Sequence, residues 1–207
     1  MRIGIIGSGM RIPTDRQIRA LHKRFAPTLD AFDLVYTHCR IVCELAEQLL
    51  ASRKHDLDVE LVRAGSLVHD IGVYRLYDSS GKLEQRDYVR HGLLGHELLR
   101  DLGFQESLCR FCSCHTGMGL SREDVVRQRL PLPVNDYLAE SDEERLVMYA
   151  DKFHSKTTPP TFISAATYVS GVRQFGRDKV DRFADLMEQF GEPDLSSLAS
   201  GYGHAIV

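Results

Sequence analysis

A histidine–aspartate pair at the end of a long apolar run constrains this chain more than any other feature. Residues Asp58 to Ile71 are apolar around most of a helical circumference, which predicts a buried helix with Asp58 as its N-cap. His69 and Asp70 would lie in its last turn, and Gly72 would end it. Free carbonyls and the negative end of the helix dipole favour a cation there. By itself the pair favours a purely structural role, so a metal site requires ligands from elsewhere in the chain.

The composition is that of an ordinary globular protein. Of 207 residues, 43% are hydrophobic and 27% charged, which suits one domain spanning 1–207. We divide it into an N-terminal helical extension (1–29), a core that carries the ligand candidates (30–156), and C-terminal helices with a tail (157–207). The formal net charge of −3 gives no electrostatic signature of nucleic-acid or anionic-membrane binding. We therefore expect a small-molecule partner, no nucleic acid and no membrane, while a homodimer stays open.

The cysteines and the absence of targeting signals indicate a cytoplasmic protein. No apolar run reaches the length of a membrane span, and the first residues lack the pattern of a signal peptide. The cysteines number five, an odd count that fits reduced thiols. A four-thiolate zinc site from Cys39, Cys43, Cys109 and Cys112 is conceivable. Both pairs, however, fall in amphipathic helical patterns, where cysteine serves as a small hydrophobic residue.

Amphipathic patterns predict helices along most of the chain. Besides the central one, the predicted helices cover residues 14–25, 30–53, 87–102, 106–115, 121–128, 141–153, 161–175 and 177–190. Ser141, with Glu144 three residues later, has the spacing of a capping box. Residues 74–86 are polar and rich in turn formers, which indicates a loop that could act as a lid. The tail after Pro193 is expected to be irregular, and the fold class is all-α.

Five of the predicted helices place a polar group where their periodicity predicts an apolar one. These inward groups are His38, His69 with Asp70, His91, His115 and Asp151. Each could be structural alone, but four imidazoles and two carboxylates are too much buried polarity to leave unpaired. Nitrogen and oxygen ligands without thiolate suit Mn, Fe, Zn, Ni or Mg. Six protein ligands exceed what one ion takes while keeping an open position, whereas two divalent ions bridged by Asp70 would use all six.

In their order along the chain, these residues resemble the HD superfamily of metal-dependent phosphohydrolases, in its HDIG subgroup. The resemblance covers about residues 30–155. It rests on His38, the run His-Asp-Ile-Gly at 69–72, His91 followed by Gly95, the run Cys-His-Thr-Gly at 114–117, and Tyr-Ala-Asp-Lys at 149–152. It implies an all-α HD-domain helical bundle, here with additional N- and C-terminal helices. It also implies that one ion is bound by His38, His69, Asp70 and Asp151, and a second by His91 and His115 with Asp70 as the bridge.

The resemblance implies hydrolysis of a small phosphate ester, and a nucleotide is the substrate we expect. Two ions roughly 3.5–4 Å apart lower the pKa of a bridging water and hold the phosphoryl oxygens during in-line attack. Asp70, Lys152 and Arg75 are the catalytic candidates, the last two by binding and neutralising substrate phosphate. Many relatives have a lysine where this chain has Val73, and Arg75 is the candidate to replace it. His96 is a candidate for lining the substrate pocket or for proton transfer. Solvated or core-packing roles are equally open for His96, Lys152 and Arg75.

Two other functions could use the same residues. Some HD proteins hold two irons with these six ligands and activate dioxygen, and the number of ligands does not separate them from hydrolases. A non-catalytic module that binds a metal or another ligand for regulation is the third alternative. Metal analysis, spectroscopy for a mixed-valence di-iron centre and a panel of phosphate esters would separate the three.

Overall fold

The fold is built almost wholly of α-helices, which confirms the predicted class. The computed structural model describes residues 12–52 and 56–207. Its α-helices are α1 (Asp15–Phe25), α2 (Leu29–Ser52), α3 (Val59–Val68), α4 (His91–Asp101), α5 (Glu106–Cys114), α6 (Arg122–Arg127), α7 (Asp142–Asp151), α8 (Ala165–Val172), α9 (Arg177–Phe190) and α10 (Leu195–Tyr202). The 3-10 helices are η1 (Ile71–Leu76), η2 (Gln85–Arg90) and η3 (Arg173–Phe175), and the strands are β1 (His154–Ser155), β2 (Thr161–Phe162) and β3 (Ala205–Ile206).

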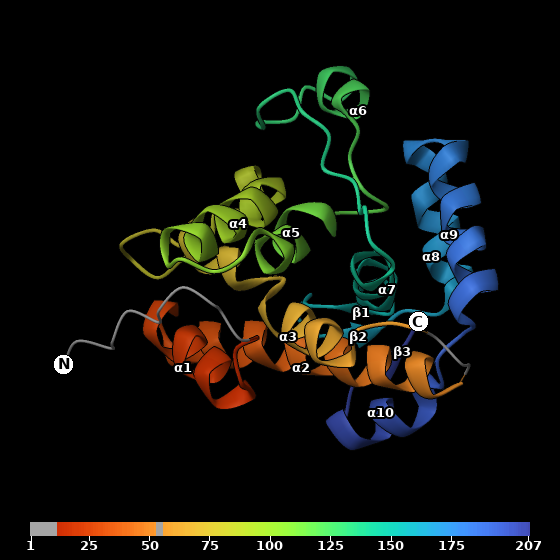
Figure 1. Cartoon of the computed structure of the whole chain (residues 1–207), viewed down its shortest axis with the longest axis horizontal. Helices are drawn as coiled ribbons and strands as arrows, with labels where there is room; N and C mark the ends of the chain where they lie inside the picture. Colours follow the sequence, from red (N-terminus) through yellow and green to blue (C-terminus); the bar gives the residue numbers. More distant parts are fainter. Residues whose placement is uncertain (1–11, 53–55) are drawn as a thin grey trace.

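Helices α2, α3 and α7 form the centre of the molecule (Figure 1). α3 packs along α2, and α7 contacts both, while α5 contacts α3 and α7 and α4 packs on α5. α1 lies at one end of α2. α9 packs on α7 at the opposite side of the molecule from α1, and α6 projects away from the bundle. The core between the central helices is apolar, and Ile41, Leu45, Val68, Leu146 and Phe153 are fully buried there. The helices that carry the ligand candidates therefore meet in the middle of the molecule.

Side-chain hydrogen bonds explain where several helices begin. Thr14, Ser121 and Ser141 cap α1, α6 and α7, and each forms a capping box with the residue three positions later. The box between Ser141 and Glu144 is the one predicted from the sequence. Asp58 caps α3 as predicted, because its side chain accepts a hydrogen bond from the backbone N–H of the third helical residue.

The segment after α3 departs from the prediction. α3 ends one residue before His69, which is its C-cap, and Asp70 lies in a turn (φ −105°, ψ 8°) before η1 begins. Gly72 lies inside η1 and does not end a helix in a left-handed conformation. A Cβ at this position would overlap the carbonyl oxygen of His91 and lie 2.7 Å from Cα of Gly95. Glycine is needed here because η1 and the first turn of α4 meet backbone to backbone.

The expected loop over 74–86 and the helix expected to follow it also differ from the structure. The first residues of the loop belong to η1, and a bridge between Tyr77 and Leu83 closes the turn that follows. The helix expected from residue 87 begins at His91, because the preceding turn is the 3-10 helix η2 with a non-helical Asp87. Gly103 follows α4 with a φ of 83°, in agreement with its predicted role as a helix stop.

The C-terminal part is more regular than the sequence predicts. The helix expected over 161–175 begins only at Ala165, because the residues before it form β2. The tail after Pro193 was expected to be irregular, and this is wrong, because it contains α10 and β3. Asp194 starts α10 by accepting a hydrogen bond from the backbone N–H of Ser196.

The three short strands form a sheet in the order β1-β2-β3. β1 and β2 pair antiparallel, with His154 opposite Phe162. β2 and β3 pair parallel, with Phe162 opposite Ile206. β1 follows α7 directly and contacts α2, so the sheet holds the last residues of the chain beside the end of α7.

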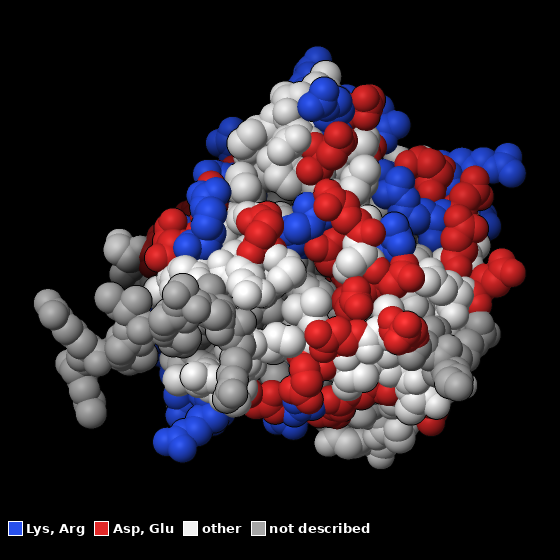
Figure 2. Space-filling view, viewed as in Figure 1, with Lys and Arg blue, Asp and Glu red and all other residues white. Residues whose placement is uncertain are grey.

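Within the described ranges, no helix has both the length and the apolar character needed to cross a bilayer. On the face shown in Figure 2, acidic and basic side chains lie interspersed over the surface. This face therefore carries no extended field of one sign.

Candidate metal centre

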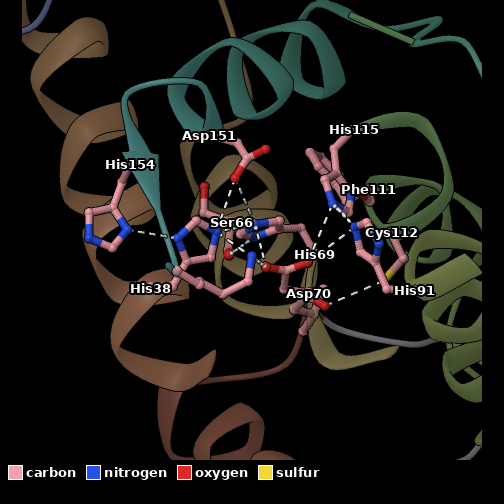
Figure 3. Close-up of polar contacts among 12 residues, drawn as sticks. His38, Ser66, His69, Asp70, His91, Phe111, Cys112, His115, Asp151 and His154 are labelled. Carbon is pink, nitrogen blue, oxygen red and sulfur yellow. Dashed lines mark hydrogen bonds and ion pairs between the residues drawn. The ribbon is translucent and has the colours of Figure 1, made fainter. Parts of the chain in front are cut away.

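The six predicted ligands meet at one place between α2, α3, α4, α5 and α7 (Figure 3). One comes from a helix interior and the others from helix ends: His38 lies within α2, His69 caps α3 with Asp70 after it, His91 begins α4, His115 caps α5 and Asp151 ends α7. The C-terminal ends of α3, α5 and α7 thus lie at the cluster. Their dipoles and free carbonyls favour positive charge there.

One group of atoms surrounds Oδ2 of Asp70. Nε2 of His38 lies 3.2 Å from this oxygen and 3.0 Å from Oδ1 of Asp151. Nε2 of His69 lies 3.6 Å from the same Asp70 oxygen and 3.4 Å from Oδ1 of Asp151. The two imidazole nitrogens are 3.2 Å apart. His38, His69 and Asp151 lie close enough together to hold a divalent ion, and Oδ2 of Asp70 lies beside the two imidazoles.

A second group of atoms faces Oδ1 of Asp70. Nε2 of His91 and Nε2 of His115 lie 3.4 Å and 3.5 Å from this oxygen and 3.0 Å from each other. Oδ1 is buried and forms no hydrogen bond with any residue that the structure describes. A buried carboxylate oxygen without a donor is costly, and a cation between it and the two nitrogens would remove that cost. The residues present therefore fit a metal ion on each side of Asp70.

The backbone holds the outer nitrogen of three of the four histidines. Carbonyl oxygens three or four residues earlier accept from Nδ1, at 2.7 Å for Ser66 and His69, 2.6 Å for Tyr88 and His91, and 3.0 Å for Phe111 and His115. A carbonyl can only accept, so Nδ1 carries the hydrogen and Nε2 keeps the lone pair. These three rings are thus held in the tautomer that binds a metal through Nε2.

Burial and nearby charges set the protonation states of the cluster. Burial opposes ionisation of Asp70, but the ammonium group of Lys156 and the surrounding imidazoles together outweigh it and hold the pKa of this carboxyl well below its usual range. At Asp151 the ammonium group of Lys152 and the imidazoles of His38 and His69 together outweigh burial and lower the pKa of that carboxyl. Burial lowers the pKa of His91 to about 3, whereas Cys39, Asp70 and Asp151 together outweigh burial at His69 and raise its pKa, so His69 would release a proton on binding a metal. Ionised carboxylates and neutral imidazoles are the states that metal ligation requires.

The cluster opens into a cavity of about 510 Å³. Its polar lining includes His91, His115, Asp151, Lys152, His154 and Lys156, and its apolar lining includes Leu34, Val89, Ile163, Tyr88 and Tyr168. The lining thus combines candidate metal ligands and positive charge with aliphatic and aromatic surface. This combination suits a molecule with one anionic and one apolar part.

Two lysines supply the positive charge of the cavity. Nζ of Lys152 donates to the carbonyl oxygen of His115 at 2.9 Å and to Oδ2 of Asp151 at 2.6 Å. Nζ of Lys156 forms an ion pair with Oδ2 of Asp70. The sequence pointed to Lys152 but not to Lys156. Lys156 lies just after the two-residue strand β1, where no helical periodicity predicts the direction of a side chain.

The structure does not bring Arg75 and His96 to the cluster. The side chain of Arg75 is exposed, because its neighbours in η1 point into the core. It lies 3.8 Å from the carboxylate of Asp101. Nδ1 of His96 lies 3.0 Å from Oγ of Ser113, and its Nε2 lies 3.4 Å from Glu106, so this ring links α4 to α5. Neither side chain lines the 510 Å³ cavity.

Comparison with known families identifies the class of protein. Residues 35–156 match the model of the HD domain. This region is more than half of the chain and contains all six clustered residues. The chain therefore belongs to the HD-domain family.

Several curated relatives are longer than the region they share with this chain. The chain is 38% identical over 120 residues to an uncharacterized protein of Methanocaldococcus jannaschii, which is 56% of this chain and 64% of that protein. It is 32% identical over 126 residues to a tRNA (cytidine(56)-2'-O)-methyltransferase of Picrophilus torridus, covering 61% of this chain and 33% of that enzyme. The enzyme of the same name from Thermoplasma volcanium is 32% identical over 121 residues, covering 58% and 32% of the two chains. The chain thus spans less than two thirds of the first relative and about one third of the other two.

Among solved structures, the fold is similar to the HD domain of the L. monocytogenes phosphodiesterase PgpH. The TM-score is 0.52 at 16% identity, and the match covers 91% of this chain and 100% of that domain. The same domain in complex with cyclic-di-AMP matches with a TM-score of 0.51, also at 16% identity, over 90% of this chain and 97% of that one. At this identity the likeness establishes the fold alone.

Proposed function

We propose that this HD protein is a metal-dependent phosphohydrolase of the HDIG subgroup that cleaves a small phosphate ester. One observation carries the proposal: the two oxygens of Asp70 face two separate groups of imidazole nitrogens, and the buried Oδ1 has no donor among the described residues. A pair of divalent ions shared by such a carboxylate supplies Lewis acidity to the phosphoryl group and lowers the pKa of a coordinated water.

The residues divide into two ligand sets around Asp70. His38, His69, Asp70 and Asp151 would hold one ion, and His91 and His115 would hold the second together with Asp70. Mn, Fe, Zn, Ni and Mg all accept this set of nitrogen and oxygen ligands. We assign no thiolate to the centre, since the five cysteines are buried and free of disulfides and none belongs to the two ligand groups.

Lys156 and Lys152 are the residues that we assign to the substrate phosphate. Lys156 replaces Arg75 in this role, because its ammonium group lies at the cluster and lines the cavity. Lys152 is held between a backbone carbonyl and Asp151, so its charge is fixed at the cavity wall before substrate arrives. An ammonium group in such a place stabilises the negative charge of a phosphate through hydrogen bonds assisted by charge.

A nucleotide is the substrate class that the cavity favours. Tyr88 and Tyr168 offer aromatic faces, and Leu34, Val89 and Ile163 add aliphatic surface that a base can contact. The complex of the PgpH domain with cyclic-di-AMP supports a nucleotide ligand for an HD domain of similar fold. We do not extend methyl transfer to this chain, because the shared region is about one third of the methyltransferases.

Metal analysis followed by a substrate panel tests the proposal. The full chain would be loaded separately with Mn²⁺, Fe²⁺, Zn²⁺, Ni²⁺ and Mg²⁺ and incubated with nucleoside mono-, di- and triphosphates, cyclic dinucleotides and a generic phosphate ester. We expect two ions per chain and hydrolysis that stops on chelation and returns when metal is restored. Tight metal binding with no hydrolysis of any ester would favour a regulatory module instead. A mixed-valence iron signal with dioxygen consumption would favour the di-iron oxygenase.

A further inference from the structure

One of the four clustered histidines differs from the others in what holds its outer nitrogen. Backbone carbonyls hold Nδ1 of His69, His91 and His115. Nδ1 of His38 instead lies 2.9 Å from Nδ1 of His154, the first residue of β1 (Figure 3). A neutral imidazole nitrogen can donate or accept, so this contact does not by itself decide which nitrogen of His38 carries the hydrogen.

The contact continues to a third imidazole. Nε2 of His154 lies 3.0 Å from Nδ1 of His204, which precedes β3. The rings are stacked at both steps, with centroids 5.2 Å apart and interplanar angles of 29° and 22°. His154 is buried at 5% exposure, while His204 is only partly buried. The three rings thus lead from the centre of the cluster to the surface.

The hydrogen bonds along the row of His38, His154 and His204 can run in two directions. The two directions differ in which nitrogen of His38 carries the hydrogen. Run outward, His38 donates to His154, His154 donates to His204, and Nε2 of His38 keeps its lone pair. Run inward, the hydrogen of His38 moves to Nε2, the atom that faces Asp70 and Asp151 at 3.2 Å and 3.0 Å. A nitrogen that carries a hydrogen cannot bind a metal. The outward direction is therefore the only one compatible with metal binding by His38.

We propose that His154 and His204 are positioning residues that hold His38 in its metal-binding tautomer. The inference rests on the metal centre of the proposed function. His204 lies beyond the residues that match the HD model, so part of this support comes from outside the family core. The strands supply the geometry, because β2 pairs with β1 on one side and with β3 on the other and so sets His204 beside His154. Outer partners of this kind commonly change metal affinity 10–100-fold when they are removed.

Two substitutions of His154 separate hydrogen bonding from packing. His154→Leu keeps apolar volume beside the ring of Phe162, whose centroid is 5.0 Å away, but leaves Nδ1 of His38 without an acceptor. His154→Gln retains a side-chain oxygen that can accept from His38. Affinity for Zn²⁺ would be measured on the full chain by competition with a chelator of known affinity. We expect His154→Leu to bind the first ion about 10–100-fold more weakly and His154→Gln to recover most of the loss.

Nitrogen-15 NMR of the zinc-loaded protein gives a readout independent of activity. In the wild type we expect His38 to show a hydrogen on Nδ1 and a metal on Nε2. In His154→Leu we expect this pattern to be lost from His38 while His69, His91 and His115 keep it, since carbonyls hold those rings.

Control variants separate the row from general destabilisation. Lys179→Met removes another buried polar side chain, one that pairs with Asp124 of α6 and contacts none of the proposed ligand side chains. Tyr202→Phe removes the 2.6 Å hydrogen bond from Tyr202 to Glu44 and so loosens α10, while it keeps the ring whose centroid lies 5.9 Å from that of His204. We expect His204→Leu to weaken Zn²⁺ binding and both controls to leave it within about twofold of the wild type.

The outcomes distinguish this inference from the proposed function. Unchanged zinc affinity and an unchanged His38 tautomer in His154→Leu would overturn the inference and leave the metal centre standing. A wild-type chain that binds no divalent ion would overturn both. Weaker binding in His154→Leu that is restored in His154→Gln would support both the centre and its outer row.

Discussion

His22 on α1 gives a prediction whose size follows from the structure. Its ring is fully buried, with Nε2 2.8 Å from the carbonyl oxygen of Leu67 and Nδ1 2.8 Å from the hydroxyl of Tyr74. The carbonyl can only accept, so Nε2 donates and Nδ1 accepts from the tyrosine hydroxyl. His22 thus holds both ends of the segment that carries His69 and Asp70.

Burial lowers the pKa of His22 to about 4 from its ordinary value of 6.5. Between these pH values the imidazole of His22 is protonated in the unfolded chain but not in the folded chain. The free energy of unfolding therefore decreases as the pH falls from 6.5 towards 4. With these two pKa values, the titration of His22 alone should lower the free energy of unfolding by about 2 kcal/mol when the pH falls from 7.5 to 5.

The substitution His22→Gln isolates this effect. A glutamine can donate to Leu67 and accept from Tyr74, but it does not titrate. Urea unfolding of both proteins in chelator, at pH 7.5 and pH 5, gives the two free-energy differences. We expect the wild type to lose about 2 kcal/mol more than His22→Gln. Parallel losses in the two proteins would show that His22 is charged in the folded state or that its pKa is not lowered, and would refute the reasoning.

Three further predictions concern the centre and its cavity. Asp70→Ala removes the carboxylate that faces both groups, so metal analysis should find neither ion and ester hydrolysis should be lost. The double variant His91→Ala/His115→Ala should retain one ion per chain, and full hydrolysis at that stoichiometry would rule out two-ion chemistry. Lys156→Met removes a charged phosphate contact worth about 1.5–3 kcal/mol, so kcat/KM should fall roughly 10–150-fold while metal content is kept. The exposed Lys82 supplies the matched control, and an equal loss in Lys82→Met would argue against a phosphate contact by Lys156.

Much of the helical framework could be predicted because its signals are local. Side-chain caps such as Ser141 with Glu144 depend on residues three apart, and the structure contains this box. The end of α3 could not be predicted in the same way. Gly72 looked like a helix stop, whereas its role is to let η1 approach the backbone of α4, a contact between segments that the sequence does not show as neighbours. The order after Pro193 also depends on partners far away in the chain, since β3 forms on β2.

The residues of the candidate site likewise divide into those that a local sequence pattern reveals and those that depend on distant contacts. His38, His91 and Asp151 were found because each interrupts an apolar helical stripe, and the structure brings them together around Asp70. Lys156 belongs to no such stripe, because it follows the strand β1 and lies outside any helix, although its side chain lines the cavity. Arg75 was expected to replace the lysine that many relatives have in place of Val73, because it lies close by in the sequence. The turn of η1, however, directs the side chain of Arg75 to solvent. The row from His154 to His204 joins elements distant in the sequence and left no local pattern.

The wide spacing of the ligands along the chain has a consequence for the order of folding. His38 and Asp151 are separated by more than half of the sequence, and the loop between them must close before their side chains can meet. Contacts of such long range form late in folding, because the chain loses conformational entropy in closing the loop before the contacts contribute stability. A bound ion would then strengthen interactions that are absent from the folding transition state. Metal loading should slow unfolding and leave the folding rate nearly unchanged, so the centre would extend the lifetime of the native protein without guiding the chain towards it.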